Sequence, residues 1–188
     1  MRLLISFLLT IVAFSASAAP ITEFKTSYEG SSVKATEVDD DWSIGDLKLS
    51  LHQDLKNTEF SLAEDDQETF NFFNIHLPVG AGSAKVNATL DFLIPEGGSG
   101  SGQGEGWWKS AFLVSGGGLE WNEQPGLIEL DNGTSFHLAF ENLSGIQLGH
   151  ESTVKATVTS KSAASVPEPG TLALLGMSLL GLGLTRRN

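Results

Sequence analysis

Alternation of apolar and polar residues with a period of two constrains the fold of this chain more than any other feature. It is clearest between residues 84 and 94, where Ala84, Ile94 and every second residue between them are apolar and the others are mostly polar. Successive side chains of a strand point to opposite faces of a sheet, so the pattern predicts a strand with one buried face. Shorter alternating runs occupy residues 47–52, 136–141 and 154–159, and helical periodicity is not convincing anywhere in residues 21–165.

Turn signals between the alternating runs indicate how the strands pair. Asp131-Asn132-Gly133 is the strongest, because Asn-Gly supplies the positive φ angles of a tight hairpin turn, and it joins residues 127–130 to residues 134–142. Residues 70–75 break the alternation by one position, which indicates a bulge or a strand buried on both faces. About nine short strands predict an all-β fold, an antiparallel β-sandwich of the jelly-roll or immunoglobulin-like kind.

A glycine-rich segment interrupts the alternating runs. Glycine occupies positions 97, 98, 100, 102, 104 and 106 within residues 95–106. We expect a flexible loop here and not a domain boundary, since neither side alone offers enough strands for an independent core. The spacing of a phosphate-binding loop is missing and no helix follows, so the segment is not a phosphate site.

The first residues have the composition of a secretion signal. Arg2 precedes an apolar stretch from Leu3 to Phe14, and small residues follow as far as Ala19. A positive charge, an apolar core and small residues in this order predict a cleavable signal peptide at residues 1–18, which signal peptidase cuts after Ala18. The apolar stretch is shorter than the roughly 20 residues of a spanning helix, and the alternatives are an uncleaved anchor or a buried helix.

The last residues contain three parts. The motif Val166-Pro167-Glu168-Pro169 comes first, an apolar stretch rich in Leu and Gly follows from Thr171 to Leu184, and Arg186 and Arg187 stand close to the end. The prolines keep the motif extended, so that a membrane enzyme can bind its exposed backbone. The apolar stretch predicts a short helix in the membrane, and the two arginines stop transfer on the cytoplasmic side.

Together these parts resemble the PEP-CTERM sorting domain. The resemblance covers residues 166–188 and implies recognition by exosortases, membrane cysteine proteases that process exported proteins of Gram-negative bacteria, often those that make extracellular polysaccharide. A plain transmembrane anchor is the main alternative, and the 14 residues of the apolar stretch are few for one. A lipid-anchor signal would end in apolar residues and a sortase substrate would carry L-P-x-T-G, and this tail does neither.

The predicted organisation is a signal peptide at residues 1–18, an acidic β-sandwich domain at residues 19–165 and a sorting tail at residues 166–188. Residues 21–165 carry 22 acidic and 8 basic side chains, a net charge near −14, which repels phosphate backbones and excludes nucleic acid as a partner. The chain has no cysteine, which excludes disulfides, thiolate catalysis and Cys-based metal cages.

The acidic runs are candidates for calcium. Asp39-Asp40-Asp41 and Glu64-Asp65-Asp66 could bind the ion through several hard oxygens, although neither fits the EF-hand loop. Solvated turns are the alternative. No catalytic residue or other cofactor site is expected, because G-x-S-x-G and H-E-x-x-H are missing and the histidines at positions 52, 76, 137 and 150 are scattered.

Tryptophans at positions 42, 107, 108 and 121 suggest contact with carbohydrate, because a flat aromatic ring suits the apolar face of a sugar. Trp107 and Trp108 are neighbours, so on one strand they point to opposite faces, one into the core and the other into solvent. Core packing or cover of a strand edge is the default interpretation, and contact of the exposed ring of one of these two with a glycan is the speculative alternative.

The two termini together favour a non-enzymatic protein of the cell surface or extracellular matrix of a Gram-negative bacterium, processed through its tail and associated with exopolysaccharide. Its partners would be signal peptidase and exosortase during export, the membrane before the tail is processed, and extracellular polysaccharide. The alternatives are a glycan- or calcium-binding module and a secreted carbohydrate-active enzyme. The enzyme would need two carboxylates facing each other in a cleft beside a tryptophan.

Overall fold

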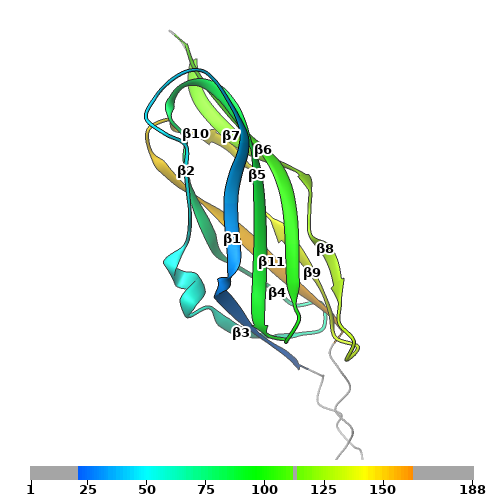
Figure 1. Cartoon of the computed structure of the whole chain (residues 1–188). Coiled ribbons are helices and arrows are strands. Elements are labelled where there is room, and N and C mark those ends of the chain that lie inside the picture. The colour runs from blue at the N-terminus through cyan, green and yellow to red at the C-terminus, as the bar shows by residue number, and fades with distance from the viewer. Residues whose placement is uncertain (1–20, 112–113, 163–188) are drawn as a thin grey trace, which may run out of the picture.

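Two antiparallel sheets face each other across a shared core in the computed structural model, which describes residues 21–111 and 114–162 (Figure 1). The first sheet has the strand order β10 (Leu143–Ile146), β7 (Val114–Glu123), β6 (Ser99–Ala111), β5 (Val79–Ile94), β1 (Ile21–Ile44) and β3 (Glu59–Ala63). The second has the order β2 (Lys48–Leu51), β4 (Gln67–His76), β11 (Glu151–Ser162), β9 (Ser135–Phe140) and β8 (Gly126–Glu129). One turn of 3-10 helix, η1 (Gln53–Lys56), follows β2. The prediction of an all-β, antiparallel fold is confirmed, and the kind of sandwich stays a prediction.

The core forms because the strands turn their apolar residues toward the opposite sheet. On β5 the predicted apolar face is buried from Ala84 to Phe92, while Ile94 at the strand end is 41% exposed. Phe136 of β9 meets Phe24 of β1 and Phe92 of β5, with ring centroids 5.2 and 5.5 Å apart. These edge-to-face contacts join the two sheets and stabilise the core beyond the burial of apolar area.

The hairpin predicted at Asp131-Asn132-Gly133 is confirmed by the pairing of β8 with β9. The turn uses its residues differently from the prediction. Of the two central residues only Gly133 has a positive φ, +85°, and the Asn132 side chain instead accepts a hydrogen bond from the Thr134 N–H at 2.9 Å. The Gly133 N–H donates to the Leu130 carbonyl at 2.9 Å. The connection is therefore a turn closed by a left-handed glycine, and asparagine contributes its side chain.

A β-bulge explains the broken alternation at residues 70–75. Phe73 of β4 pairs with Val154 of β11 and Asn71 pairs with Lys155, so Phe72 is an extra residue in its strand. Phe72 and Phe73 are both fully buried, and their rings meet edge to face with centroids 5.2 Å apart. The bulge lets two neighbouring aromatic side chains enter the same core.

The glycine-rich segment is mainly a strand, so the prediction of a flexible loop at residues 95–106 is wrong. β6 begins at Ser99 and lies between β5 and β7. Its glycines at positions 100, 102, 104 and 106 are buried and alternate with exposed or half-buried polar residues. A Cβ on Gly100 would lie 2.8 Å from Leu138 Cδ2, and one on Gly102 would lie 3.0 Å from Phe140 Cδ2. Side chains of the second sheet fill the space that a Cβ would need at Gly100 and Gly102, so these two inward positions require glycine.

Strand lengths also differ from the prediction. The described residues contain eleven strands instead of about nine, and β1 and β5 are long, with 24 and 16 residues. Register shifts interrupt the pairing of β1 with β5 at four places. Such irregularities bend a strand and increase its twist, so a long strand can follow a twisted core.

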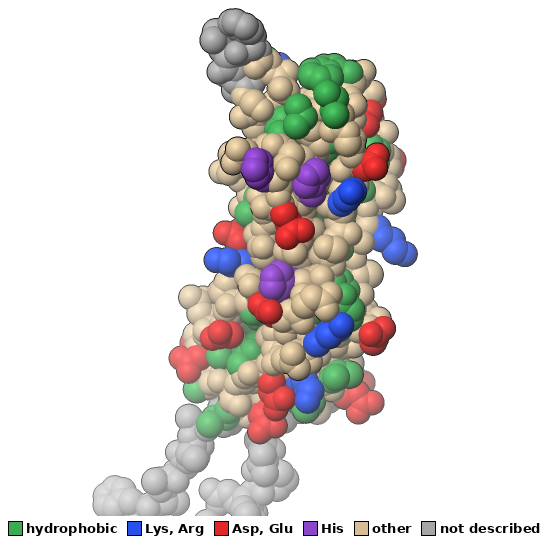
Figure 2. Space-filling view, turned by 90° about the vertical axis from the view of Figure 1, so that its left-hand side faces the viewer, with side chains coloured by type: hydrophobic (Ala, Val, Ile, Leu, Met, Phe, Trp, Pro, Cys, Tyr) green, Lys and Arg blue, Asp and Glu red, His purple; other side chains and the backbone are tan. Residues whose placement is uncertain are grey.

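The described chain ends lie at one end of the domain. β1 begins at Ile21 and β11 ends at Ser162, both at the lower end in Figure 1. Apolar side chains gather at the opposite end (Figure 2), and the exposed residues where β1 ends and β5 begins are Trp42, Ile44 and Val79. The predicted signal peptide at residues 1–18 and the predicted tail and apolar helix at residues 166–188 lie outside the described residues. Within the part of the chain that the structure describes, no helix is long and apolar enough to cross a membrane.

Candidate functional site

The outer face of the first sheet, which points away from the core, brings together polar residues and a tryptophan from three strands. Residues in register on neighbouring antiparallel strands point to the same side of a sheet. Asp39 of β1, Ser83 of β5 and Trp107 of β6 form one row, and Lys85 of β5 lies opposite Glu105 of β6 in the next. A carboxylate, a hydroxyl and an indole ring are therefore neighbours on this face.

A groove lies on this face where β1 departs from regular pairing with β5. The register shifts between Thr36 and Asp39 and again after Asp40. Glu37 lies between Thr36 and Asp39 and has a φ of +49°, a left-handed conformation that residues other than glycine rarely adopt. Two adjoining hollows of about 460 and 360 Å³ share Asp39 and Ser83 in their lining, and we call them together the β1–β5 groove.

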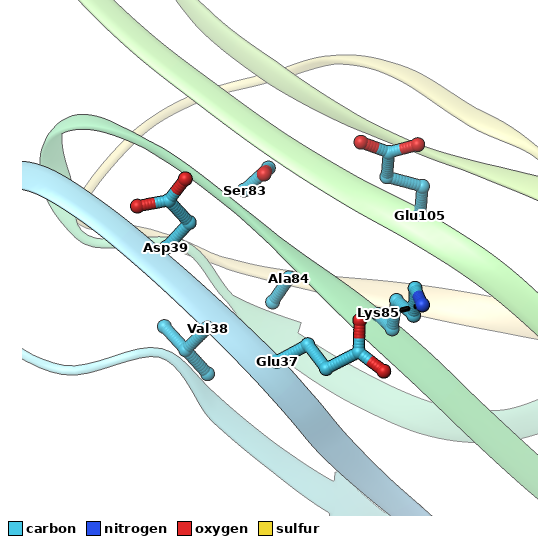
Figure 3. A pocket seen from close by; sticks show the side chains of 7 residues that line it. All are labelled: Glu37, Val38, Asp39, Ser83, Ala84, Lys85 and Glu105. Atoms are coloured by element: carbon cyan, nitrogen blue, oxygen red, sulfur yellow. Dashed lines mark ion pairs between the residues drawn. The ribbon is translucent and has the colours of Figure 1, made fainter.

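The charged groups of the β1–β5 groove are mostly carboxylates. Lys85 forms an ion pair with Glu37, which the dashed line in Figure 3 marks. The carboxylates of Asp39 and Glu105 lie on either side of Ser83 and do not meet each other (Figure 3). The charged residues that line the groove are Glu37, Asp39, Asp41 and Glu105 on the acidic side and Lys85 and Lys109 on the basic side. Four negative charges against two positive charges make the groove acidic, which favours a neutral or cationic ligand.

Trp107 and Trp108 point to opposite faces of β6, as their adjacency predicts. Trp108 is 2% exposed and lies in the core, whereas Trp107 is 45% exposed on the outer face. The Trp107 ring lies over β7, where a Cβ on Gly118 would be 3.0 Å from its Cε2 and Nε1 atoms. Because glycine stands there, the ring rests against the sheet with its remaining surface open. Of the two predicted glycan-contact residues the structure leaves Trp107 accessible and buries Trp108, and glycan contact itself stays a prediction.

Trp42 is a second exposed tryptophan next to the β1–β5 groove. It is 51% exposed and lies opposite Ala81, which lines the groove. Strand spacing and rise per residue put its Cα about 12 Å from that of Trp107, two strands and one row of side chains away. The amino-acid sequence does not indicate that the two tryptophans lie on one face, because only the register of β5 with its two neighbours brings them together.

The two acidic runs predicted as calcium candidates lie in separate places. In the first run, Asp40 Oδ2 accepts a hydrogen bond from Ser43 Oγ at 3.0 Å, while its neighbours line the groove. The second run, Glu64-Asp65-Asp66, connects β3 to β4, and Asp65 pairs with Lys161 at 2.9 Å. In residues 21–111 and 114–162 no three His, Cys, Asp or Glu side chains come together in a way that could hold a metal ion. Calcium binding stays a prediction.

The histidines do not contribute to the groove. His52 caps η1, where its Nδ1 accepts a hydrogen bond from the Asp54 N–H at 3.2 Å. His137 of β9 lies opposite Leu127 of β8 on the second sheet, and histidines are spread over the face in Figure 2. The described residues that line the groove include no histidine.

The comparisons with known proteins concern the tail. Residues 165–187 match a family model described as the PEP-CTERM protein-sorting motif. The match includes the predicted motif residues Val166, Pro167, Glu168 and Pro169 and the predicted stop-transfer residues Arg186 and Arg187, which all lie outside the described residues. Comparison with curated proteins gave no match, and neither did comparison with solved structures. The resemblance of the tail is thereby confirmed, and the chain is an exported protein with a PEP-CTERM tail that is sorted through exosortase.

Proposed function

We propose that this protein is a non-catalytic component of the cell surface or extracellular matrix of a Gram-negative bacterium, where its β domain binds exopolysaccharide. The observation that carries the proposal is the half-exposed ring of Trp107 in the β1–β5 groove of a domain that carries a sorting tail. A sugar has apolar C–H faces and hydroxyl groups at its edge. An aromatic surface beside hydroxyl and carboxylate groups therefore suits it.

The positions of the chain ends support this function. Ile21 and Ser162 lie at one end of the domain, and the groove lies toward the other, where β1 ends and β5 begins (Figure 1). While the apolar stretch from Thr171 to Leu184 holds the unprocessed chain in the membrane, the groove would face away from the bilayer. A polysaccharide outside the membrane could then reach it before and after exosortase acts.

The arrangement of the carboxylates favours binding over hydrolysis. A glycoside hydrolase uses two carboxyl groups that face each other across the scissile bond, about 5 to 10 Å apart. In the groove Glu37 is engaged by Lys85, and Ser83 separates Asp39 from Glu105 (Figure 3). Carboxylates placed separately can still accept hydrogen bonds from sugar hydroxyls. A carbohydrate-active enzyme is therefore the weaker alternative.

Fractionation of the producing bacterium tests the proposal. The protein is followed in cells, matrix and medium of the wild type and of a strain that cannot export polysaccharide. We expect it in the matrix of the wild type and in the medium of the mutant, because the mutant lacks the ligand that retains it. An exported protein without a sorting tail serves as the control for general secretion.

Intact-mass analysis of the same fractions tests the processing steps. We expect a mass that corresponds to loss of residues 1–18 and of most of the tail, with any added group visible as a further difference. The same distribution of the protein in both strains would rule out retention by polysaccharide. A cytoplasmic protein with both ends intact would rule out the export pathway as well.

A further inference from the structure

We propose that the β1–β5 groove selects sugars that carry a free amino group, so that the polysaccharide held by this protein contains amino sugars without N-acetyl groups. This inference rests on the proposed function and adds the class of ligand and the residues that recognise it. In this arrangement one sugar ring lies on Trp107, and the ammonium group of a neighbouring sugar of the same chain lies toward Asp39.

The charge of the groove is the first argument. Lys85 is engaged by Glu37. The charged side chains that remain in the lining are the carboxylates of Asp39, Asp41 and Glu105 and the ammonium group of Lys109. Among the described residues none of these three carboxylates forms an ion pair. Carboxylates without a partner attract an ammonium group and repel a uronate, and this effect is strongest at low ionic strength.

Trp107 is the second and independent argument. Its ring rests over Gly118, and nearly half of its surface is exposed on the outer face. A cation within about 6 Å of an indole ring is attracted to the electron-rich face of the ring. An amino sugar that lies on Trp107 therefore gains both apolar contact with the ring and attraction of its ammonium group.

The distance between the two groups suits neighbouring units of one polysaccharide chain. Asp39 and Trp107 belong to the same row and are separated by Ser83, so their Cα atoms are two strand spacings apart, about 10 Å. The Trp107 ring leans over β7, away from Asp39, so one sugar lies on the indole and a neighbouring unit lies over the small Ser83 side chain with its amine toward the carboxylate. The exposed ring of Trp42, about 12 Å from Trp107, offers contact to a further unit of the same chain.

Calorimetric titration of the processed protein from its host with three oligosaccharides of equal length tests the inference. The probes are oligomers of β-1,4-linked glucosamine, of N-acetylglucosamine and of galacturonic acid, which are cationic, neutral and anionic. We expect the tightest binding for the glucosamine oligomer, weaker binding for the acetylated oligomer and none for the uronate. The affinity for the glucosamine oligomer should fall as salt is added.

Two variants with matched controls locate the site. Trp107→Ala should lower the affinity for both the cationic and the neutral oligomer by about tenfold or more, the effect of truncating an aromatic anchor. Its control is Leu127→Ala, which removes an exposed apolar side chain from the second sheet. Asp39→Asn should lower the affinity for the cationic oligomer by roughly two- to fivefold and that for the neutral oligomer by less, because the amide oxygen of asparagine still accepts hydrogen bonds from hydroxyl groups. Its control is Glu129→Gln, which removes one negative charge from β8 and should have no effect.

The possible outcomes test the location of the site, its selectivity and the proposed function separately. Circular dichroism first establishes that each variant is folded. Equal affinity for the cationic and neutral oligomers, or tight binding of the uronate, refutes the selectivity but leaves retention by polysaccharide standing. Binding of glucosamine that survives Trp107→Ala, or that Glu129→Gln weakens as much as Asp39→Asn, refutes the groove as the site. Failure of all three probes refutes this inference alone, because the fractionation experiment decides the proposed function.

Discussion

Replacement of Gly104 by alanine should destabilise the domain, whereas the same change at Gly106 should stabilise it. Both glycines lie on the inward face of β6. A Cβ on Gly104 would lie 2.7 Å from the Glu120 carbonyl oxygen and 3.0 Å from Trp121 Cε3, and a contact under 3.0 Å requires something to move. The oxygen belongs to the backbone of β7, which is paired with β6 and cannot rotate away. A Cβ on Gly106 would meet its first neighbour, Val86 Cγ2, at 3.7 Å, which is an ordinary contact.

The expected magnitudes follow from these distances. Overpacking of a core costs about 1 to 3 kcal/mol, so Gly104→Ala should lower the free energy of unfolding by about 2 kcal/mol. In a domain of this size that change lowers the midpoint of thermal unfolding by about 4 to 8 °C. Gly106→Ala restricts the unfolded chain and adds a methyl group to the core, so it should raise the free energy of unfolding by about 0.5 to 1 kcal/mol.

Urea and thermal unfolding of the exported protein and the two variants measure these changes. Circular dichroism follows the loss of strands, and tryptophan fluorescence follows the environment of the buried Trp108 and Trp121. If close approach of neighbouring atoms requires glycine at position 104 and not at position 106, the two variants change the free energy of unfolding in opposite directions. A Gly104→Ala protein as stable as the wild type, or shifts of both variants in the same direction, would show that close approach of the second sheet and of β7 does not demand glycine in β6.

Two further predictions concern stability. Gly133→Ala should lower the free energy of unfolding by about 1 kcal/mol, since Gly133 has a φ of +85° in the β8–β9 turn; an unchanged thermal midpoint would contradict this. Trp108→Ala should cost about 3 to 5 kcal/mol because it leaves a cavity in the core, whereas Trp107→Ala should cost less, about 1 to 2 kcal/mol, because only one side of its half-exposed ring packs on the sheet. Equal losses in urea unfolding would contradict the opposite placement of the two rings.

Local patterns predicted those parts of the fold that depend on neighbouring residues alone. The buried face of β5 and the β8–β9 hairpin could be recognised, because the period of side chains and the turn residues are each visible in a short window. The bulge was one of two interpretations of residues 70–75, and the structure placed it at Phe72. The strand β6 could not be recognised, because glycine has no apolar signature. Its inward positions become intelligible only beside Leu138 and Phe140 of the second sheet.

The candidate site was predictable only in part. The adjacency of Trp107 and Trp108 predicted that one ring is exposed, and the structure identified Trp107 as that ring. The neighbourhood of Trp107 was not predictable. Asp39 lies in the same row as Trp107 only because β5 lies between β1 and β6 and pairs with both strands. The groove beside them lies where the register of β1 shifts around Glu37, which has a left-handed conformation.

The sequence by itself determined that this protein is exported, that its tail is a sorting signal and that its domain is made of antiparallel strands. Processing enzymes recognise a short linear segment, and the alternation of side chains is a local property of the chain. Both can therefore be recognised without knowledge of the tertiary structure. Only the tertiary structure decided that glycines form a central strand and that Trp107, Asp39 and Ser83 share one face. These features depend on the register of strands distant in the chain, which the packing of both sheets sets together.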